Sequence, residues 1–402
     1  MTAEAVVLNT CGTAMAADSA VTIGDGKNAR IYYSDEKIFH LSSKHYVGIM
    51  THGCSCFMSI DWELILALFS KFLGDRVLDT LEDYVHELFR FLESSEYIEV
   101  GQDYNFERIA VRFLDRIEER FKSYSSKNHK KEYLSEAEKS DAIEKFLRKI
   151  GKKIENEKST SIYDGDILVK KYQKGIIENF PEIFNDFFIN DTLKEETMKL
   201  LISFFSKMES PWWSNISSGI VFAGYGSREL FPSVIHFSIT GKFNDKLYHT
   251  KPDKKDLLQE SKSWIGTYAQ TDVMQPFISG MDPYFEKTIF RQMEKLSRGI
   301  IKLAGKQYKE EIDELKDNFL DKIRNHGDDN YVFPLKKILA SLPVNKLAEI
   351  AEALVTLTSL RRHMSTEEET VGGPTDVAII TKAEGFVWVK RKILNKKLAG
   401  QK

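Results

Sequence analysis

Residues 2–22 read TAEAVVLNTCGTAMAADSAVT and contain two strand-like runs in close succession. The first run covers residues 2–10, and the second covers residues 12–17 and ends on Asp18-Ser19. Short, largely apolar runs that end at turn residues are typical of β-strands. The stretch therefore predicts that the chain opens with two consecutive strands.

Thr2 directly follows the initiator Met1. If Met1 is removed, the hydroxyl group and the free α-amine belong to the same residue. A threonine hydroxyl is a poor nucleophile at neutral pH, but an adjacent amine can accept its proton. The reference pKa of an α-amine, about 7.7–8.0, suits that task. Thr2 is therefore a candidate nucleophile, although threonine is also an ordinary strand residue.

The rest of the chain alternates between strand and helix patterns. Strand-like runs continue to residue 60, and helical periodicity dominates residues 61–210, with full apolar stripes at 62–73 and 81–92. Residues 124–160 are rich in Lys, Glu and Ser, which indicates either a solvated helix pair or a mobile loop. Further strands are expected at 30–33, 37–41, 46–50, 217–224, 232–240, 246–249, 376–381 and 385–390.

Two later segments have helical periodicity, residues 283–325 and 343–363. In the second segment Ser341 is the expected cap, and Pro343 is expected in the first turn. The order of strands, helices, strands, helices and strands predicts an α+β fold with a helical insertion. The core is expected to comprise residues 1–60 and 211–402. Residues 61–210 are expected to hold the first core helix and the insertion.

Composition excludes several classes of function. The formal net charge is -3 with mixed signs along the chain, which argues against nucleic-acid binding. No apolar run reaches the ~18 residues of a membrane span, and the start of the chain lacks the basic region of a signal peptide. Three cysteines without a disulfide pattern favour the cytoplasm. Cys54-Ser55-Cys56 lacks zinc spacing, so free thiols and neither a metal nor a cofactor are expected.

Several motifs together carry a family resemblance. They are, in order, Thr2, Ala16-Ala17-Asp18-Ser19-Ala20-Val21-Thr22, Glu36-Lys37-Ile38-Phe39, Gly48-Ile49-Met50-Thr51-His52-Gly53, the run Gly219 to Tyr225, and Val371-Gly372-Gly373-Pro374-Thr375-Asp376. This ordered set resembles the proteasome β-type subunits of the N-terminal nucleophile (Ntn) hydrolases, as a divergent, bacterial-type member with a large helical insertion. The resemblance implies a four-layer αββα sandwich and a threonine hydrolase that cleaves amide bonds, chiefly in peptides.

The resemblance also implies roles for individual residues. Thr2 would be the nucleophile, and Lys37 would lower the pKa of its hydroxyl. Asp18 would hold Lys37 by a charge-assisted hydrogen bond. His52-Gly53 falls where the family places the backbone N–H that binds the oxyanion, with His52 as the expected donor. Thr22 matches the family's threonine that binds the substrate strand.

Two supporting positions depart from the family pattern. Thr271-Asp272-Val273-Met274 stands where the family has Gly-Ser-Gly, and Asp272 would take the place of the serine. Glu368, within Glu367-Glu368-Glu369, aligns with a family aspartate and keeps a carboxylate there. Outside the resemblance, Asp18 fits a turn acid, Lys37 a surface lysine, and His52 a structural histidine.

Alternative functions stay open at this stage. One is a catalytically silent structural subunit or binding module with the same fold, and another is a small-molecule amidase. The expected partners are a peptide or protein substrate and further copies of the chain in a homo-oligomer. The helical insertion could cap the entrance of the active site, lengthen the wall of a barrel-shaped assembly or recruit a regulatory partner. Neither nucleic acid nor membrane is an expected partner.

Overall fold

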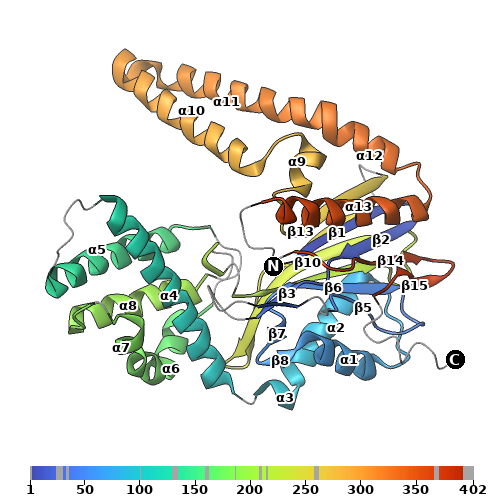
Figure 1. Ribbon diagram of the computed structural model, residues 1–402, viewed down its shortest axis with the longest axis horizontal. Coiled ribbons are helices and arrows are strands. Elements are labelled where there is room, and N and C mark those ends of the chain that lie inside the picture. Colours follow the sequence, from blue (N-terminus) through green and yellow to red (C-terminus); the bar gives the residue numbers. More distant parts are fainter. Residues whose placement is uncertain are drawn as a thin grey trace.

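The computed structural model describes residues 2–23, 30–32, 36–99, 101–128, 135–158, 163–185, 187–207, 211–213, 216–257, 262–365 and 371–392. Its sheets are antiparallel and are accompanied by helices, so the predicted α+β class is confirmed. Figure 1 shows helices above, below and to the left of the sheets, and a long helical hairpin at the top of the view.

The first sheet is built around the opening residues of the chain. Its order of described strands is β13-β1-β2-β14-β15. The bounds are β1 Ala3–Asn9, β2 Gly12–Ala17, β13 Ser263–Ala269, β14 Asp376–Thr381 and β15 Gly385–Lys390. Both β1 and β2 are buried throughout. The two consecutive strands predicted from residues 2–17 are therefore present, and they form the middle of this sheet.

The second sheet has the order β11-β10-β9-β6-β5, and β12 pairs with β10. The bounds are β5 Ile38–His40, β6 Val47–Gly53, β9 Ser218–Gly224, β10 Ser233–Phe243, β11 Lys246–His249 and β12 Asp253–Asp256. Two short hairpins complete the described strands: β3 (Val21–Ile23) with β4 (Arg30–Tyr32), and β7 (Cys56–Phe57) with β8 (Ile60–Asp61). The predicted strands do not include β3, β7, β8, β12 and β13. In β13, Gly266 interrupts the β-forming pattern.

The two sheets face each other across an apolar core. Val6 and Met15 of the first sheet join Met50 and Val221 of the second in one buried cluster. Because side chains alternate along a strand, Ala5 and the other odd-numbered residues of β1 face the opposite side. That outer face packs against α13 (Val344–His363). The opening strands therefore lie between a layer of helices and the second sheet.

The helices that follow β8 are α1 Trp62–Leu73, α2 Leu81–Ser94, α3 Glu96–Glu99, α4 Gln102–Asn128, α5 Glu136–Glu155, α6 Gly165–Glu178, α7 Phe180–Ile183 and α8 Asp191–Phe205. They reach the second sheet through α2 and α4, which contact it directly. One continuous apolar cluster runs from the sheet through α1 and α2 into α4–α8. Within the stretch 124–160, α5 is a docked helix, because Ile143, Leu147 and Ile154 are buried. The described part of that stretch is therefore mainly helical, as one alternative predicted, but α5 is docked rather than solvated.

The helices near the end of the chain cover the first sheet and extend beyond it. They are α9 Met274–Ser279, α10 Pro283–Ala304, α11 Lys309–Gly327, α12 Phe333–Leu339 and α13. The predicted helical segment 283–325 is two helices, because the chain turns at Gly305 with a φ of 105°. Helices α10 and α11 form the projecting hairpin of Figure 1.

The predicted start of α13 needs a correction. Pro343 is the N-cap residue rather than part of the first turn, and α13 has no side-chain cap. The hydroxyl of Ser341 instead donates to the carbonyl oxygen of Ile338 at the end of α12. Ser341 therefore serves the preceding helix, because the chain makes a tight turn between the two.

Candidate active site

Thr2 directly precedes β1, and 7% of its surface is exposed. Hydrogen bonds hold the backbone at Thr2 and at the next residue, Ala3. The carbonyl oxygen of Thr2 accepts a hydrogen bond from the N–H of Gln270 at 3.0 Å. The N–H of Ala3 donates to Oδ1 of Asp18 at 2.9 Å. The position of Thr2 is therefore set by two neighbouring strands and by a buried carboxylate.

Asp18 is the centre of this arrangement. Its Oδ1 accepts from Ala3 N–H and from Nζ of Lys37 at 2.7 Å. Its Oδ2 accepts from the N–H groups of Gly372 at 3.0 Å and Ala20 at 3.2 Å. Four donors on one buried carboxylate occupy both of its oxygens and fix its orientation. The turn that delivers Gly372 continues through Gly373, whose φ of 76° favours glycine.

Lys37 is buried with 3% of its surface exposed, immediately before β5. Its ammonium donates to Asp18 and to the carbonyl oxygen of Ala20 at 2.6 Å. An ammonium has three N–H donors, and acceptors among the described residues take two of them. A buried ammonium without a partner is costly, and the Asp18 carboxylate compensates this one. The structure thus brings Asp18, Lys37 and the residue next to Thr2 into one hydrogen-bonded group.

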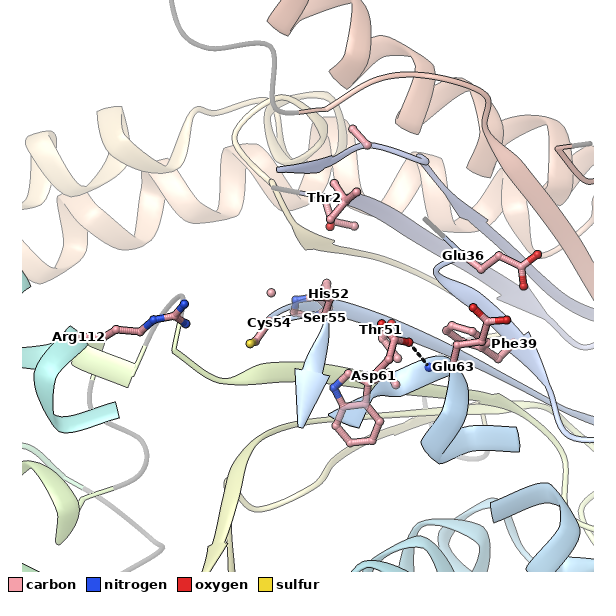
Figure 2. Close-up of a pocket in the computed structure, with 14 residues that line it drawn as sticks. Thr2, Glu36, Phe39, Thr51, His52, Cys54, Ser55, Asp61, Glu63 and Arg112 are labelled. Atoms are coloured by element: carbon pink, nitrogen blue, oxygen red, sulfur yellow. Dashed lines mark hydrogen bonds between the residues drawn. The ribbon is translucent and has the colours of Figure 1, made fainter. Parts of the chain in front are cut away.

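A pocket of about 220 Å³ opens beside Thr2. Figure 2 shows Thr2 above His52 and Cys54, with Arg112 on one side and Glu63 on the other. The remaining lining residues are Ala20, Val21, Glu36, Phe39, Thr51, Gly53, Ser55, Asp61 and Trp62. The candidate nucleophile therefore faces a hollow that could hold the group to be attacked.

The end of β6 offers a backbone donor to this pocket. Thr51 N–H donates to the carbonyl oxygen of Lys37 on the β5 side, and Cys54 N–H donates to that of Ser217 on the β9 side. Successive N–H groups along an antiparallel strand point to alternate sides. The N–H of His52 therefore points with that of Cys54 toward β9. The N–H of Gly53 points to the β5 side, beyond the first residue of that strand.

His52 is a neutral imidazole at neutral pH. Burial lowers its pKa from 6.5 to about 3, with smaller contributions from His236 and Lys37. Its ring stacks on that of His236 with the ring centroids 5.5 Å apart. Gly219 lies opposite His52, and an added Cβ there would come within 2.0 Å of the ring. His52 is thus packed in place, and its ring charge is absent from the pocket above pH 6.5.

The depressed pKa of His52 predicts acid sensitivity. Between pH 6.5 and about 3 the unfolded chain binds a proton that the folded chain does not, so the free energy of unfolding falls as pH falls. We expect the wild type to lose up to about 2 kcal/mol more than His52→Phe between pH 6.5 and pH 5. Urea unfolding at both values measures this difference. Equal losses in the two proteins would contradict it.

The other predicted site residues have different surroundings. Asp272 forms an ion pair of 2.6 Å with Arg362 of α13. Nε of Arg362 also donates to the Gln270 side chain, whose backbone N–H binds Thr2. Asp272 is therefore linked to Thr2 through Arg362 and Gln270. Glu368 lies outside the described residues, as does the side chain of Thr22, whose backbone belongs to β3.

Gln270 and Arg112 are the residues that sequence reasoning missed. Gln270 follows directly after β13, and the pairing of Ala269 with Ala3 carries it to Thr2. Arg112 lies on α4, far from Thr2 in sequence. No sequence motif marks either residue, and both reach the site through tertiary structure.

Comparisons with known proteins do not assign a family. No protein-family profile matches the chain, and no curated protein matches its sequence. Among the described residues, no group of three or more His, Cys, Asp or Glu side chains is arranged to hold a metal ion. None of the described helices is long and apolar enough to cross a membrane.

Proposed function

We propose that this protein is an N-terminal threonine hydrolase that cleaves amide bonds in peptides after Met1 is removed. The observation that carries the proposal is the hydrogen-bonded group at Thr2. Asp18 Oδ1 accepts from both Ala3 N–H and Lys37 Nζ, beside a pocket that Thr2 lines. In the proposed reaction Thr2 would be the nucleophile, Lys37 would provide a positive charge, and the pocket would hold the substrate.

The reaction would proceed in two stages. The Thr2 hydroxyl attacks the amide carbonyl carbon while the α-amine takes the hydroxyl proton. The C–N bond then breaks, the same proton passes to the leaving amine, and an ester on Thr2 remains. Water attacks this ester, gives its proton to the α-amine, and releases a carboxylic acid. The Thr2 hydroxyl is restored by that proton.

The surrounding residues would stabilise the charges that develop. The Lys37 ammonium favours the ionised oxygen of Thr2, since a nearby positive charge lowers the pKa of a hydroxyl. The oxyanion would accept a hydrogen bond from the N–H of Gly53. The alternation of N–H groups along β6 favours this donor over the N–H of His52, which points toward β9. Asp18 would act through Lys37 and Ala3 by holding both in place.

The arrangement of layers supports the same proposal. Helix α13 covers one sheet, α1 and α2 cover the other, and the two sheets enclose an apolar core. We infer that this is the four-layer αββα sandwich of the Ntn hydrolases. In such a sandwich the nucleophile belongs at the start of a central strand, where Thr2 precedes β1.

The competing functions make different predictions about Met1. A structural subunit or binding module does not need a free α-amine at Thr2, whereas both peptidase and small-molecule amidase do. A panel of fluorogenic peptides and simple amides tests all three. Two forms of the protein are compared, one that begins at Thr2 and one that retains Met1. We expect peptide hydrolysis by the first form only; equal rates, or no hydrolysis by either, would contradict the proposal.

A further inference from the structure

Helix α4 carries four arginines at intervals of four residues: Arg108, Arg112, Arg116 and Arg120. Side chains at this spacing lie along one face of a helix. Three of the four contact other residues of the chain. Arg108 donates to Asn105, Arg116 donates to the carbonyl oxygen of Trp212 at 2.8 Å, and Arg120 lies 4.0 Å from the centre of the Trp212 ring.

Arg112 differs from the other three. It makes no hydrogen bond or ion pair within the described part of the chain, and it lines the pocket beside Thr2. Figure 2 shows its side chain extending toward the pocket from the side of Cys54. A guanidinium is always charged and presents its donors in a planar fork that matches a carboxylate. The insertion thus contributes to the candidate active site a cation that has no partner among the described residues.

The backbone that carries Arg112 is firmly held. The next residue, Phe113, is fully buried and stacks on Phe204 of α8 with the ring centroids 3.9 Å apart. Leu114 is also fully buried. Arg112 therefore projects from a fixed backbone position. Binding of a substrate group to it then costs less conformational entropy of the protein.

The opposite side of the pocket has the other sign of charge. Glu63 lines that side and has no ion pair among the described residues, whereas Glu36 is paired with Arg391 at 2.9 Å. Figure 2 shows Glu63 and Arg112 on opposite sides of Thr2. The pocket therefore has a positive charge on one side and a negative charge on the other. This charge distribution favours substrates bound in one orientation.

We propose that Arg112 binds a carboxylate of the substrate and makes the site selective for peptides with a negative charge on the α4 side of the scissile amide. This inference rests on the proposed hydrolase function. The carboxylate belongs either to an acidic side chain or to a free C-terminus, and the guanidinium would bind both in the same way. The insertion thereby acts as a specificity wall of the active site.

The test uses internally quenched peptides that differ in one group. One set carries Glu, Gln or Lys at each position next to the scissile amide, and a second set ends in a free carboxylate or an amide. We expect the wild type to prefer a carboxylate in one set by about ten- to a hundredfold in kcat/KM. Arg112→Gln should lose this preference, and Arg112→Glu should favour Lys instead.

Arg298→Gln is the matched control, because it removes the same charge from the projecting helix α10. It should keep the wild-type preference. A preference that persists in Arg112→Gln would overturn the inference, as would a wild type that does not discriminate in either set. Cleavage without charge preference would leave the hydrolase function standing while the role of Arg112 fails.

Peptide binding to Thr2→Ala tests the role of Arg112 when hydrolysis is absent. Fluorescence anisotropy of labelled peptides measures their affinity without hydrolysis. If the wild type cleaves no peptide, but carboxylate peptides bind Thr2→Ala about tenfold more tightly than neutral ones and adding Arg112→Gln removes that difference, the recognition role stands without the hydrolase. If peptides neither bind nor are cleaved, both proposals are wrong.

Discussion

Thr2→Ala is expected to lose peptide hydrolysis by about 10⁴-fold or more while remaining folded. Members of a catalytic unit depend on one another, so removing the nucleophile removes nearly all of the unit's contribution. The backbone bonds at Ala3 and Gln270 do not involve the Thr2 side chain and should persist. The wild type and Thr2→Ala are compared, each with Met1 removed. Steady-state assays measure the activity, and thermal melts measure the stability.

Thr2→Ser is the matched control for this change. Serine keeps the hydroxyl and the α-amine and lacks only the methyl group, so most of the activity should remain. A Thr2→Ala protein that hydrolyses peptides at near the wild-type rate would show that the nucleophile lies elsewhere. Cys54 would then be the first residue to examine, since it lines the same pocket.

Asp18→Asn is expected to lower the free energy of unfolding by about 3–5 kcal/mol. The Asp18–Lys37 pair is buried, with 0% and 3% of the side chains exposed. The substitution would leave a buried ammonium without a counter-charge. It would also place an amide NH₂ against backbone N–H donors that now meet carboxylate oxygens. Activity should fall as well, because Lys37 loses its anchor.

A double-mutant cycle with Lys37→Met isolates the pair. Lys37→Met removes the charge that needs compensation, so Asp18→Asn should cost less stability in that background than alone. Urea unfolding of the four proteins gives the coupling energy. If Asp18→Asn alone unfolds at the wild-type midpoint, Asp18 and Lys37 do not form the buried pair and the site assignment fails.

The sequence predicts the central strands well because their signals are local. Residues 2–17 give β1 and β2, and 376–381 and 385–390 give β14 and β15 at the predicted bounds. The Asp18–Lys37 contact is one that the family resemblance implies, through the motifs that contain the two residues. Strand β13 was missed because Gly266 breaks its pattern, although it provides the neighbour of β1.

The rest of the site depends on packing between distant segments. Arg112 reaches the pocket only because α4 docks through Phe113 onto α8. Gln270 reaches Thr2 only through the register between β1 and β13. The link between Asp272 and Arg362 requires α13 to lie across the first sheet. Neither hydrophobic periodicity nor local motifs encode such register and docking.

The most direct test of the account is the site of acylation. The form that begins at Thr2, the form that retains Met1, and Thr2→Ala are each incubated with an activated peptide ester, and their intact and fragment masses are measured. We predict one acyl group on Thr2 in the first form and none in the other two. Acylation of the Met1-retaining form to the same extent, or an acyl group on Cys54 in place of Thr2, would contradict an N-terminal threonine nucleophile.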